Sequence, residues 1–285
     1  MYQDIGKVYK QIRTSKGFTQ KEVCGDWMSR SNLSKFESGQ SMTSYQTMDH
    51  LLRKIDMTFE EFNYLYEINY SNLRQRIIHD VTNYLSFYNT KKLKKLGEMC
   101  EEYLNTVTND DLAIENIQMI LKIIIEIRQG NKNEHAQQLA EILWKEIEGR
   151  DTWYESELRI LSTILFYFPI ESLKNITDKI LYSLDKYKHY KDMENHSFSL
   201  LTNLAGMYLW NNYFNDCCRI TNRAFELARK LKRYDQLGFS QVRLGICRHD
   251  EQLITQGLQL LELTGELEFH RILTEEVRHF HRSDF

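Results

Sequence analysis

Proline and glycine are scarce in this chain. Its 285 residues include one proline and 12 glycines. Both residues interrupt helices, proline because it lacks a backbone donor and glycine because of its conformational freedom. Apolar residues make up 42% of the sequence and charged residues 27%, which suits a folded chain and not a disordered one. The sequence therefore predicts an all-α protein, long enough for a small domain and a larger one.

Positive charge is concentrated near the N-terminus. The whole chain has a formal net charge of -3. Residues 1–55 hold nine Lys and Arg against five Asp and Glu, a net charge of +4, so the remainder carries -7. A basic segment in an otherwise acidic chain indicates a surface that binds a polyanion such as nucleic acid.

The five cysteines follow no disulfide or zinc pattern. Their number is odd and no CxxC spacing occurs, which favours reduced, buried thiols. The N-terminus has no apolar signal-peptide core, and the most apolar stretch, residues 117–127, is broken by Lys122 and Glu126 and is too short to span a bilayer. We expect a cytoplasmic protein without membrane segment, metal or cofactor.

Local signals in the first 66 residues predict a five-helix domain. Thr19 can cap one helix, with Glu22 completing a capping box, and Ser29 or Ser31 can cap the next. Glycine follows the end of a helix in two places, at Gly17 and Gly39. The expected helices are residues 4–15, one from Thr19, one from Ser29 or Ser31, residues 44–55 and residues 58–66.

The second and third of these helices carry a known motif. Residues 17–24 followed by residues 29–39 resemble the helix-turn-helix of the Xre/Cro repressor class. In that motif the third helix enters the major groove of DNA, where Arg and Lys suit guanine and Asn suits adenine. The candidates for reading bases are Arg30, Ser31, Asn32 and Lys35. The candidates for holding phosphates are Gln20, Thr19, Arg13, Lys16 and Ser34. The alternative is that all of these are solvated polar residues on a small bundle, and the motif and the local charge favour DNA binding.

The rest of the chain, residues 67–285, reads as pairs of helices joined by short polar connections. The clearest pair resembles a tetratricopeptide (TPR) unit, because Ala205, Cys217 and Ala224 fall at the small positions where paired helices approach closely. Gly245 and Gly257 lie 40 residues beyond the first two and repeat the pattern. We expect a TPR-like right-handed solenoid with hairpins near residues 72–106, 110–148 and 151–187, two further hairpins, and a final helix near residues 265–281.

Stacked hairpins of this kind form a concave groove that binds extended peptides. In the TPR pattern Asn203 faces the groove and Arg243 holds the equivalent place one repeat later. An amide can bond a peptide unit, and a guanidinium can pair with a carboxylate. The expected floor around them contains Thr202, Gly206, Leu209, Trp210, Phe239, Val242 and Ile246. The alternative assigns Trp210 and Phe239 to packing within the hairpins.

The order of these parts resembles the Rgg/GadR/MutR regulators of Gram-positive bacteria. The resemblance covers the whole chain, and its motifs are residues 29–39, the Trp153-Tyr154-Glu155 segment and Asn203. It implies a DNA-binding domain at residues 1–66 and a peptide-binding and dimerisation domain at residues 67–285. It also implies a homodimer that binds double-stranded promoter DNA and a short signalling peptide imported after secretion, as in quorum sensing. Arg150 and Tyr154 are placed at the peptide groove by the same resemblance.

Three other interpretations stay open. A metal-dependent enzyme has its best support in four histidines, but no HExxH, phosphate loop, nucleophile elbow or Rossmann pattern accompanies them, so we expect no catalytic residue. These histidines are His249, His270, His279 and His281. A protein-interaction scaffold would keep the solenoid and not bind DNA. A phage-type peptide-sensing regulator would share the architecture.

Overall fold

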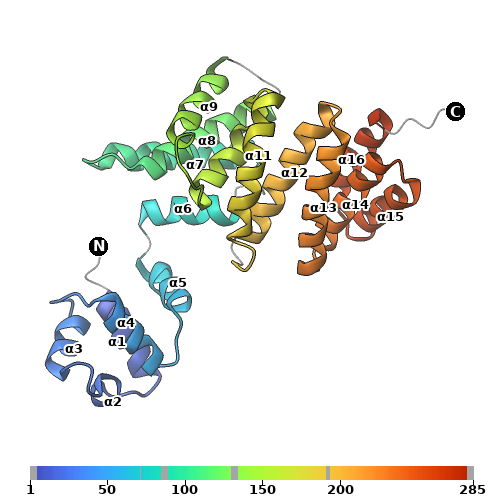
Figure 1. Cartoon of the computed structure of the whole chain (residues 1–285). Helices are drawn as coiled ribbons and strands as arrows, with labels where there is room; N and C mark the ends of the chain where they lie inside the picture. Colours follow the sequence, from blue (N-terminus) through green and yellow to red (C-terminus); the bar gives the residue numbers. More distant parts are fainter. Residues whose placement is uncertain (1–4, 71, 85–88, 130–133, 191–192, 281–285) are drawn as a thin grey trace. The chain divides into compact units, whose positions relative to one another are not determined.

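The computed structural model is helical and has no strand in the residues that it describes, which are 5–70, 72–84, 89–129, 134–190 and 193–280 (Figure 1). The chain forms two compact units, Met1–Ile114 and Glu115–Phe285. The all-α prediction is confirmed, and the functional boundary at residue 66 stays a prediction. Within the described ranges, no helix has both the length and the apolar character needed to cross a lipid bilayer.

The first unit begins with five helices, which we call the head. Thr19 caps the second helix in the predicted capping box with Glu22, and Ser29 caps the third. Local side chain to backbone bonds thus fix where the two short helices begin. The fifth helix continues past its predicted end near residue 66. The five are α1 (Ile5–Ser15), α2 (Gln20–Cys24), α3 (Arg30–Glu37), α4 (Tyr45–Lys54) and α5 (Phe59–Tyr70).

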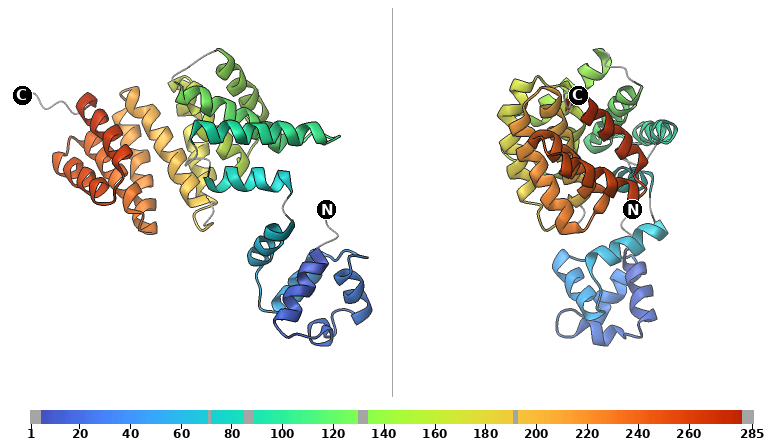
Figure 2. Two further views of the ribbon diagram at one scale, coloured as in Figure 1. Left: turned by 180° about the vertical axis from the view of Figure 1, so that it is seen from behind. Right: turned by 90° about the vertical axis from the view of Figure 1, so that its right-hand side faces the viewer.

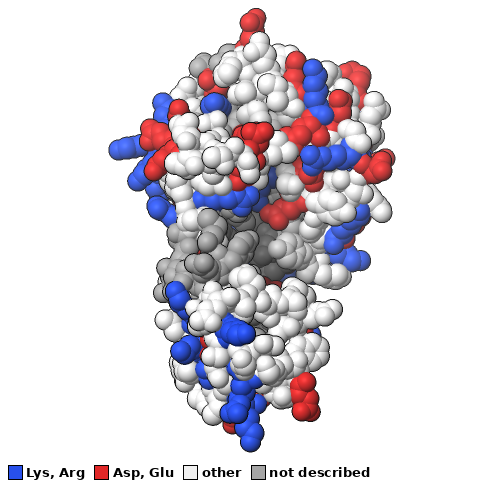
Figure 3. Space-filling model, turned by 90° about the vertical axis from the view of Figure 1, so that its left-hand side faces the viewer, with Lys and Arg blue, Asp and Glu red and all other residues white. Residues whose placement is uncertain are grey.

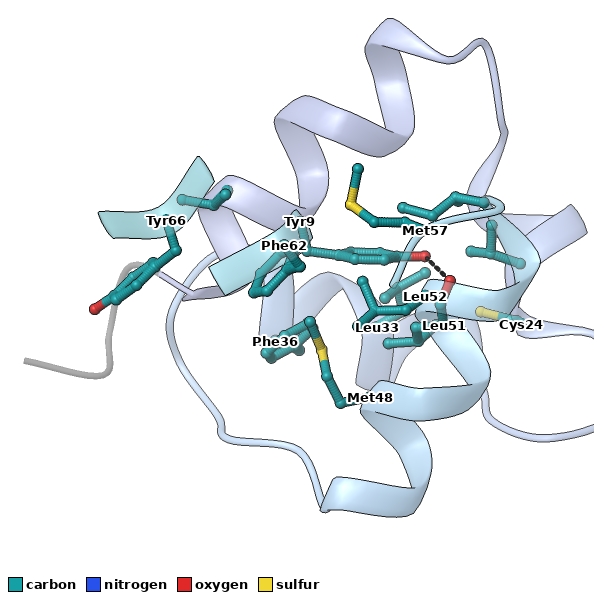
Figure 4. Packing of buried hydrophobic residues seen from close by; sticks show 13 residues of the cluster. Tyr9, Cys24, Leu33, Phe36, Met48, Leu51, Leu52, Met57, Phe62 and Tyr66 are labelled. Carbon is teal, nitrogen blue, oxygen red and sulfur yellow. Dashed lines mark hydrogen bonds between the residues drawn. The ribbon is translucent and has the colours of Figure 1, made fainter. Parts of the chain in front are cut away.

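Aromatic and aliphatic side chains from all five helices fill the core of the head (Figure 4). Tyr9 is completely buried, and its hydroxyl donates to the Leu51 carbonyl at 3.3 Å. Burial raises the pKa of the Tyr9 phenol. Gly6 lets α1 approach α3, because a Cβ at this position would lie 1.8 Å from the Phe36 carbonyl oxygen. The orientation of α3 is therefore set by a contact that only glycine permits.

Two further helices complete most of the first unit, α6 (Leu73–Tyr84) and α7 (Thr90–Thr106), and they pack together as the predicted first hairpin. Arg74 at the start of α6 donates from Nε to Asp111 at 2.6 Å, and the Tyr103 hydroxyl donates to the same carboxylate at 3.0 Å. The hydrogen bond from Arg74 lowers the pKa of Asp111. This ion pair joins the beginning of the hairpin to the residues just before α8 (Leu112–Arg128).

The second unit continues the helical hairpins, and α12 to α16 pack in succession (Figures 1 and 2). The predicted pairing is confirmed for α12 with α13 and for α14 with α15, and a final helix follows; the helices of the hairpins predicted at residues 110–148 and 151–187 are present, and their pairing stays a prediction. The predicted end of that helix, His281, lies outside the described residues. The elements are the remainder of α8, α9 (Glu134–Ile147), α10 (Glu155–Ile164), the 3-10 turn η2 (Leu165–Tyr167), α11 (Ile170–Asp185), α12 (Glu194–Trp210), α13 (Phe214–Leu231), α14 (Tyr234–Arg248), α15 (Glu251–Leu263) and α16 (Leu267–Phe280).

Small residues sit where these helices come closest, as predicted. Ala205, Cys217 and Ala224 are buried. A Cβ at Gly245 would lie 2.6 Å from the Cγ1 atom of Ile254, and one at Gly257 would lie 2.8 Å from a backbone oxygen of α14. Larger side chains at either glycine would push α14 and α15 apart. The close stacking of α12 to α15 positions the cavity described below.

Candidate functional site

The outer face of α3 is polar and exposed. Leu33 and Phe36 turn into the core, which leaves the opposite side of the helix to solvent. The five predicted DNA contacts on this helix are all exposed, and none of their side chains has a hydrogen-bond partner among the described residues. These are Arg30, Ser31, Asn32, Ser34 and Lys35. The structure thus brings together donors and acceptors that are free to meet an outside partner.

Arg13 has a structural position that the sequence analysis missed. Its guanidinium is buried and donates from Nε to Glu37 Oε1 at 2.6 Å and from Nη2 to Oε2 at 3.0 Å. The Gln20 amide donates to the same carboxylate at 2.9 Å. The hydrogen bond with Glu37 raises the pKa of Arg13. In this conformation the charge of Arg13 is buried and paired, and the network ties α1, α2 and α3 together; a contact of Arg13 with phosphate stays a prediction.

Two other predicted phosphate contacts also serve the fold. The Thr19 hydroxyl donates to Glu22 Oε2 at 2.7 Å, and hydrogen bonds from Thr19 lower the pKa of Glu22. Lys16 Nζ donates to the carbonyls of Ile55 at 2.7 Å and Asp56 at 2.9 Å, beyond the end of α4. Cations stabilise this end of a helix because its carbonyls lack partners. Both side chains stay at the surface, so their contact with phosphate remains a prediction.

The surface charge of the head matches its sequence. On the face shown toward the bottom of Figure 3, Lys and Arg outnumber Asp and Glu. Most acidic side chains in that view belong to other parts of the chain. The net positive charge of residues 1–55 is thus visible at the surface, where it can attract a polyanion.

The second unit contains a cavity of about 410 Å³. Its wall is formed by η2, α12, α14 and α16. The predicted peptide-binding residues Asn203, Trp210 and Arg243 lie together in this wall, with the expected neighbours Thr202 and Gly206. The complete wall is Phe166, Thr202, Asn203, Gly206, Met207, Trp210, Asn211, Arg243 and Glu276. This volume lies within the range of small-ligand pockets, roughly 300–1,000 Å³.

Arg243 is held firmly on all sides but one. It is only 5% exposed, and it donates from Nε to Glu276 Oε2 at 3.1 Å and from Nη2 to Oε1 at 2.5 Å. Its Nη1 donates to the Thr202 carbonyl at 2.8 Å, and its guanidinium carbon lies 4.6 Å from the centre of the Phe239 ring. Asn203 donates from Nδ2 to the Ser162 carbonyl at 3.1 Å. Helices α10, α12, α14 and α16 are thereby linked through the cavity wall.

Several predicted groove residues lie elsewhere. Ile246, Leu209 and Val242 are fully buried and do not line the cavity, so their expected place on the floor stays a prediction. Phe239 is also buried, and its ring packs against Phe198 and Phe269, as the packing alternative states. These side chains face other helices because the helices of the second unit stack closely on one another.

Arg150 and Tyr154 are not part of the cavity wall either. Arg150 forms ion pairs with Glu146, at 3.1 Å, and with Glu157. Tyr154 precedes α10 and is 60% exposed. Next to it, Trp153 is buried and donates to the Ile147 carbonyl at 2.9 Å, which anchors the start of α10. The roles of Arg150 and Tyr154 in peptide binding remain predictions.

Glu276 is one of four wall residues that sequence reasoning missed. It is 4% exposed and lies on α16, on the face that also buries Leu273. A charged residue three positions after a core leucine, on a face otherwise apolar, was a signal that it has a buried partner. Phe166, Met207 and Asn211 were also missed, because nothing in a helical pattern marks the side chains that line a cavity.

His279, one of the four histidines on which the enzyme interpretation rested, packs against aromatic side chains. The ring of His279 lies 5.1 Å from that of Trp210 and packs on Phe280. In the described ranges, no three or more His, Cys, Asp or Glu side chains are placed to hold a metal ion. His281 lies outside the described residues.

Comparison with known proteins identifies the family. Residues 94–239, more than half of the chain, match the family described as "HTH-type transcriptional regulator Rgg, C-terminal domain". The chain belongs to the Rgg family. Rgg proteins are regulators of transcription and not enzymes, so the predicted family and the absence of catalysis are confirmed. No curated protein sequence matches the chain significantly.

Solved structures with the same fold cover nearly all of this Rgg protein. A transcriptional regulator from Listeria monocytogenes EGD-e has a TM-score of 0.77 at 18% identity, and the match covers 98% of each chain. The SHP pheromone receptor Rgg2 of Streptococcus dysgalactiae has a TM-score of 0.67 at 18% identity, over 96% of this chain and 99% of that one. Bacillus thuringiensis PlcR, solved in complex with the peptide PapR7 and DNA, has a TM-score of 0.64 at 17% identity, over 96% and 99%. These likenesses confirm the predicted fold, a helix-turn-helix head with TPR-like helical hairpins.

Proposed function

We propose that this Rgg protein is a cytoplasmic, peptide-responsive regulator that binds promoter DNA as a homodimer and is switched by a short imported signalling peptide. The observation that carries the proposal is the cavity in the second unit, with Asn203, Trp210 and Arg243 in its wall. It is supported by the exposed polar face of α3 in a family that regulates transcription. PlcR, which has this fold, was solved with a peptide and DNA.

In this proposal α3 reads the operator. Arg30 and Lys35 would donate to guanine, Asn32 would pair with adenine, and Ser31 and Ser34 would support them. The Arg13–Glu37 bridge would hold α3 at the angle that the groove requires, without touching DNA. A side chain that is already buried and ion-paired can orient a reading helix more reliably than an exposed one.

The peptide would act as a switch only through differential affinity. A ligand shifts the equilibrium between two dimer arrangements by the difference between its binding free energies for the two. The cavity is lined by four separate elements, so a peptide in it would change how α12, α14 and α16 pack against one another. Activation and repression both fit this scheme.

DNA binding is tested by fluorescence anisotropy, with the full chain and duplexes from upstream of its own gene, over a range of salt concentrations. We expect binding that weakens steeply with salt, because neutralised phosphates release counterions. Arg30→Gln should cost base discrimination of about 1–3 kcal/mol, whereas Lys54→Gln, which removes the same charge from α4, should not. Binding without salt dependence or sequence preference would favour the scaffold interpretation.

Peptide binding is tested by calorimetry with synthetic peptides from short reading frames that neighbour the gene. Asn203→Ala should weaken the binding of the active peptide and leave DNA binding by the free protein intact. Asn105→Ala, on the exposed side of α7, is the matched control. Arg243→Ala should weaken peptide binding too. It also leaves Glu276 as a buried charge without its partner, so the folding of this variant must be measured in parallel. Equal loss of peptide and DNA binding in Asn203→Ala would contradict a separate sensor site.

A further inference from the structure

The ion pair in the cavity wall is already neutral before a ligand enters. Both oxygens of Glu276 accept from Arg243, and both residues are about 95% buried. A guanidinium that has a buried carboxylate partner keeps its donors but no longer presents a net charge. This bears on the sequence-based expectation that Arg243 pairs with a carboxylate of the ligand.

One edge of the Arg243 guanidinium remains open to the cavity. A Cβ at Gly206 would lie 3.7 Å from Nη1 and 3.9 Å from Nη2, so the missing side chain of Gly206 leaves room beside both atoms. Each of these nitrogens carries two hydrogens, and the structure gives each one partner, Thr202 and Glu276, within the described residues. One hydrogen on each is left for a ligand.

We propose that this open edge of Arg243 donates to an uncharged carbonyl group of the peptide, and that Glu276 makes the cavity select against anionic groups. The inference rests on the proposed function and names the ligand chemistry of the same site. A carbonyl oxygen accepts both donors and brings no net charge. A carboxylate at the same place would lie beside the carboxylate of Glu276, which is 4% exposed, and like charges repel more strongly when one of them is buried. Glu276 is thus a specificity-determining residue.

The rest of the wall fits the same ligand. Phe166, Met207 and Trp210 offer apolar surface for an uncharged side chain. Asn203 uses its Nδ2 atom on Ser162, and its Oδ1 atom has no partner among the described residues, so it can accept from a peptide N–H. One donor edge and one acceptor in an apolar cavity match an extended, uncharged peptide segment.

The test uses two small probes that differ in one terminal group, a neutral amide in one and a carboxylate in the other. N-acetyl-leucinamide carries a neutral amide where N-acetylleucine carries a carboxylate. The full chain is labelled with 5-fluorotryptophan, and the fluorine resonance of Trp210, assigned among the four tryptophans with Trp210→Phe, reports occupation of the cavity. In the wild type we expect the amide to bind at least about tenfold more tightly than the carboxylate.

Two variants separate charge selection from simple packing. Glu276→Gln leaves Arg243 without a counter-ion, so the preference should reverse in favour of N-acetylleucine. The double variant Arg243→Gln with Glu276→Gln removes both charges, so the wild-type preference should disappear. Circular dichroism melts show which variants fold. If Glu276→Gln does not fold, the probe preference of the double variant is compared with that of the wild type instead.

Three outcomes would overturn the inference: a wild type that prefers N-acetylleucine, a folded variant that keeps the wild-type preference, or no response of Trp210 to either probe. The probes include neither DNA nor a signalling peptide. If the protein binds DNA and a signalling peptide but does not prefer N-acetyl-leucinamide, only the proposed selectivity is contradicted. If it prefers N-acetyl-leucinamide but binds no DNA, the proposed function is contradicted.

Discussion

Replacing Gly206 by alanine should stabilise α12 and weaken ligand binding in the same molecule. The new methyl group would lie 3.7 and 3.9 Å from the two terminal nitrogens of Arg243, which is ordinary van der Waals contact, so nothing has to move. Alanine in place of glycine inside a helix contributes about 1 kcal/mol. For a unit of this size the melting temperature should rise by roughly 2–4 °C.

The same methyl group covers the open edge of Arg243. A hydrogen bond to a charged group is worth about 1.5–3 kcal/mol, so the affinity for N-acetyl-leucinamide should fall at least about tenfold. Calorimetric melts and the Trp210 fluorine titration measure the two effects. Gly97→Ala in α7 is the matched control: among the described residues, nothing beyond the adjoining backbone of α7 lies within 4 Å of the new Cβ, so this variant should gain stability only. A lower melting temperature in Gly206→Ala, or an unchanged affinity, would refute the reasoning.

Three more predictions concern stability and DNA binding. Burial lowers the pKa of His196 to about 4, so the unfolded chain binds more protons and stability should fall by roughly 2–3 kcal/mol as the pH drops from 6.5 to 4; melts of His196→Leu should lack this loss. Gly6→Ala should unfold the head, because its Cβ would overlap the Phe36 carbonyl, and circular dichroism with anisotropy should show lost helix and lost DNA binding. Glu37→Gln should lower the melting temperature by weakening the bridge to Arg13, and an unchanged melt would contradict a structural role for that bridge.

The parts of the fold that depend on residues close together in the sequence could be predicted from the sequence alone. The capping box at Thr19 and Glu22 formed as expected, because its partners are three residues apart. The close approaches at Gly245 and Gly257 were predictable because small residues recur at the repeat spacing. Helix periodicity, caps and small-residue repeats are local signals, so they can be recognised without knowledge of tertiary contacts.

The ion pairs that shape both candidate sites could not be predicted in this way. Arg13 and Glu37 are 24 residues apart, and Arg243 and Glu276 are 33 apart. Arg13 lies four residues after Tyr9, on the buried face of α1, but its partner comes from another helix, so the sequence does not show the ion pair. A buried charge is tolerated only with its partner in place, so its role depends on tertiary packing.

The division of labour between the head and the cavity is tested most directly by hydrogen–deuterium exchange of the full chain, measured once with operator DNA and once with the active peptide. We predict that DNA slows exchange most in α2 and α3, and that the peptide slows it most in α12, α14 and α16. A peptide that protects the head most strongly, or DNA that leaves α3 unprotected, would contradict the account.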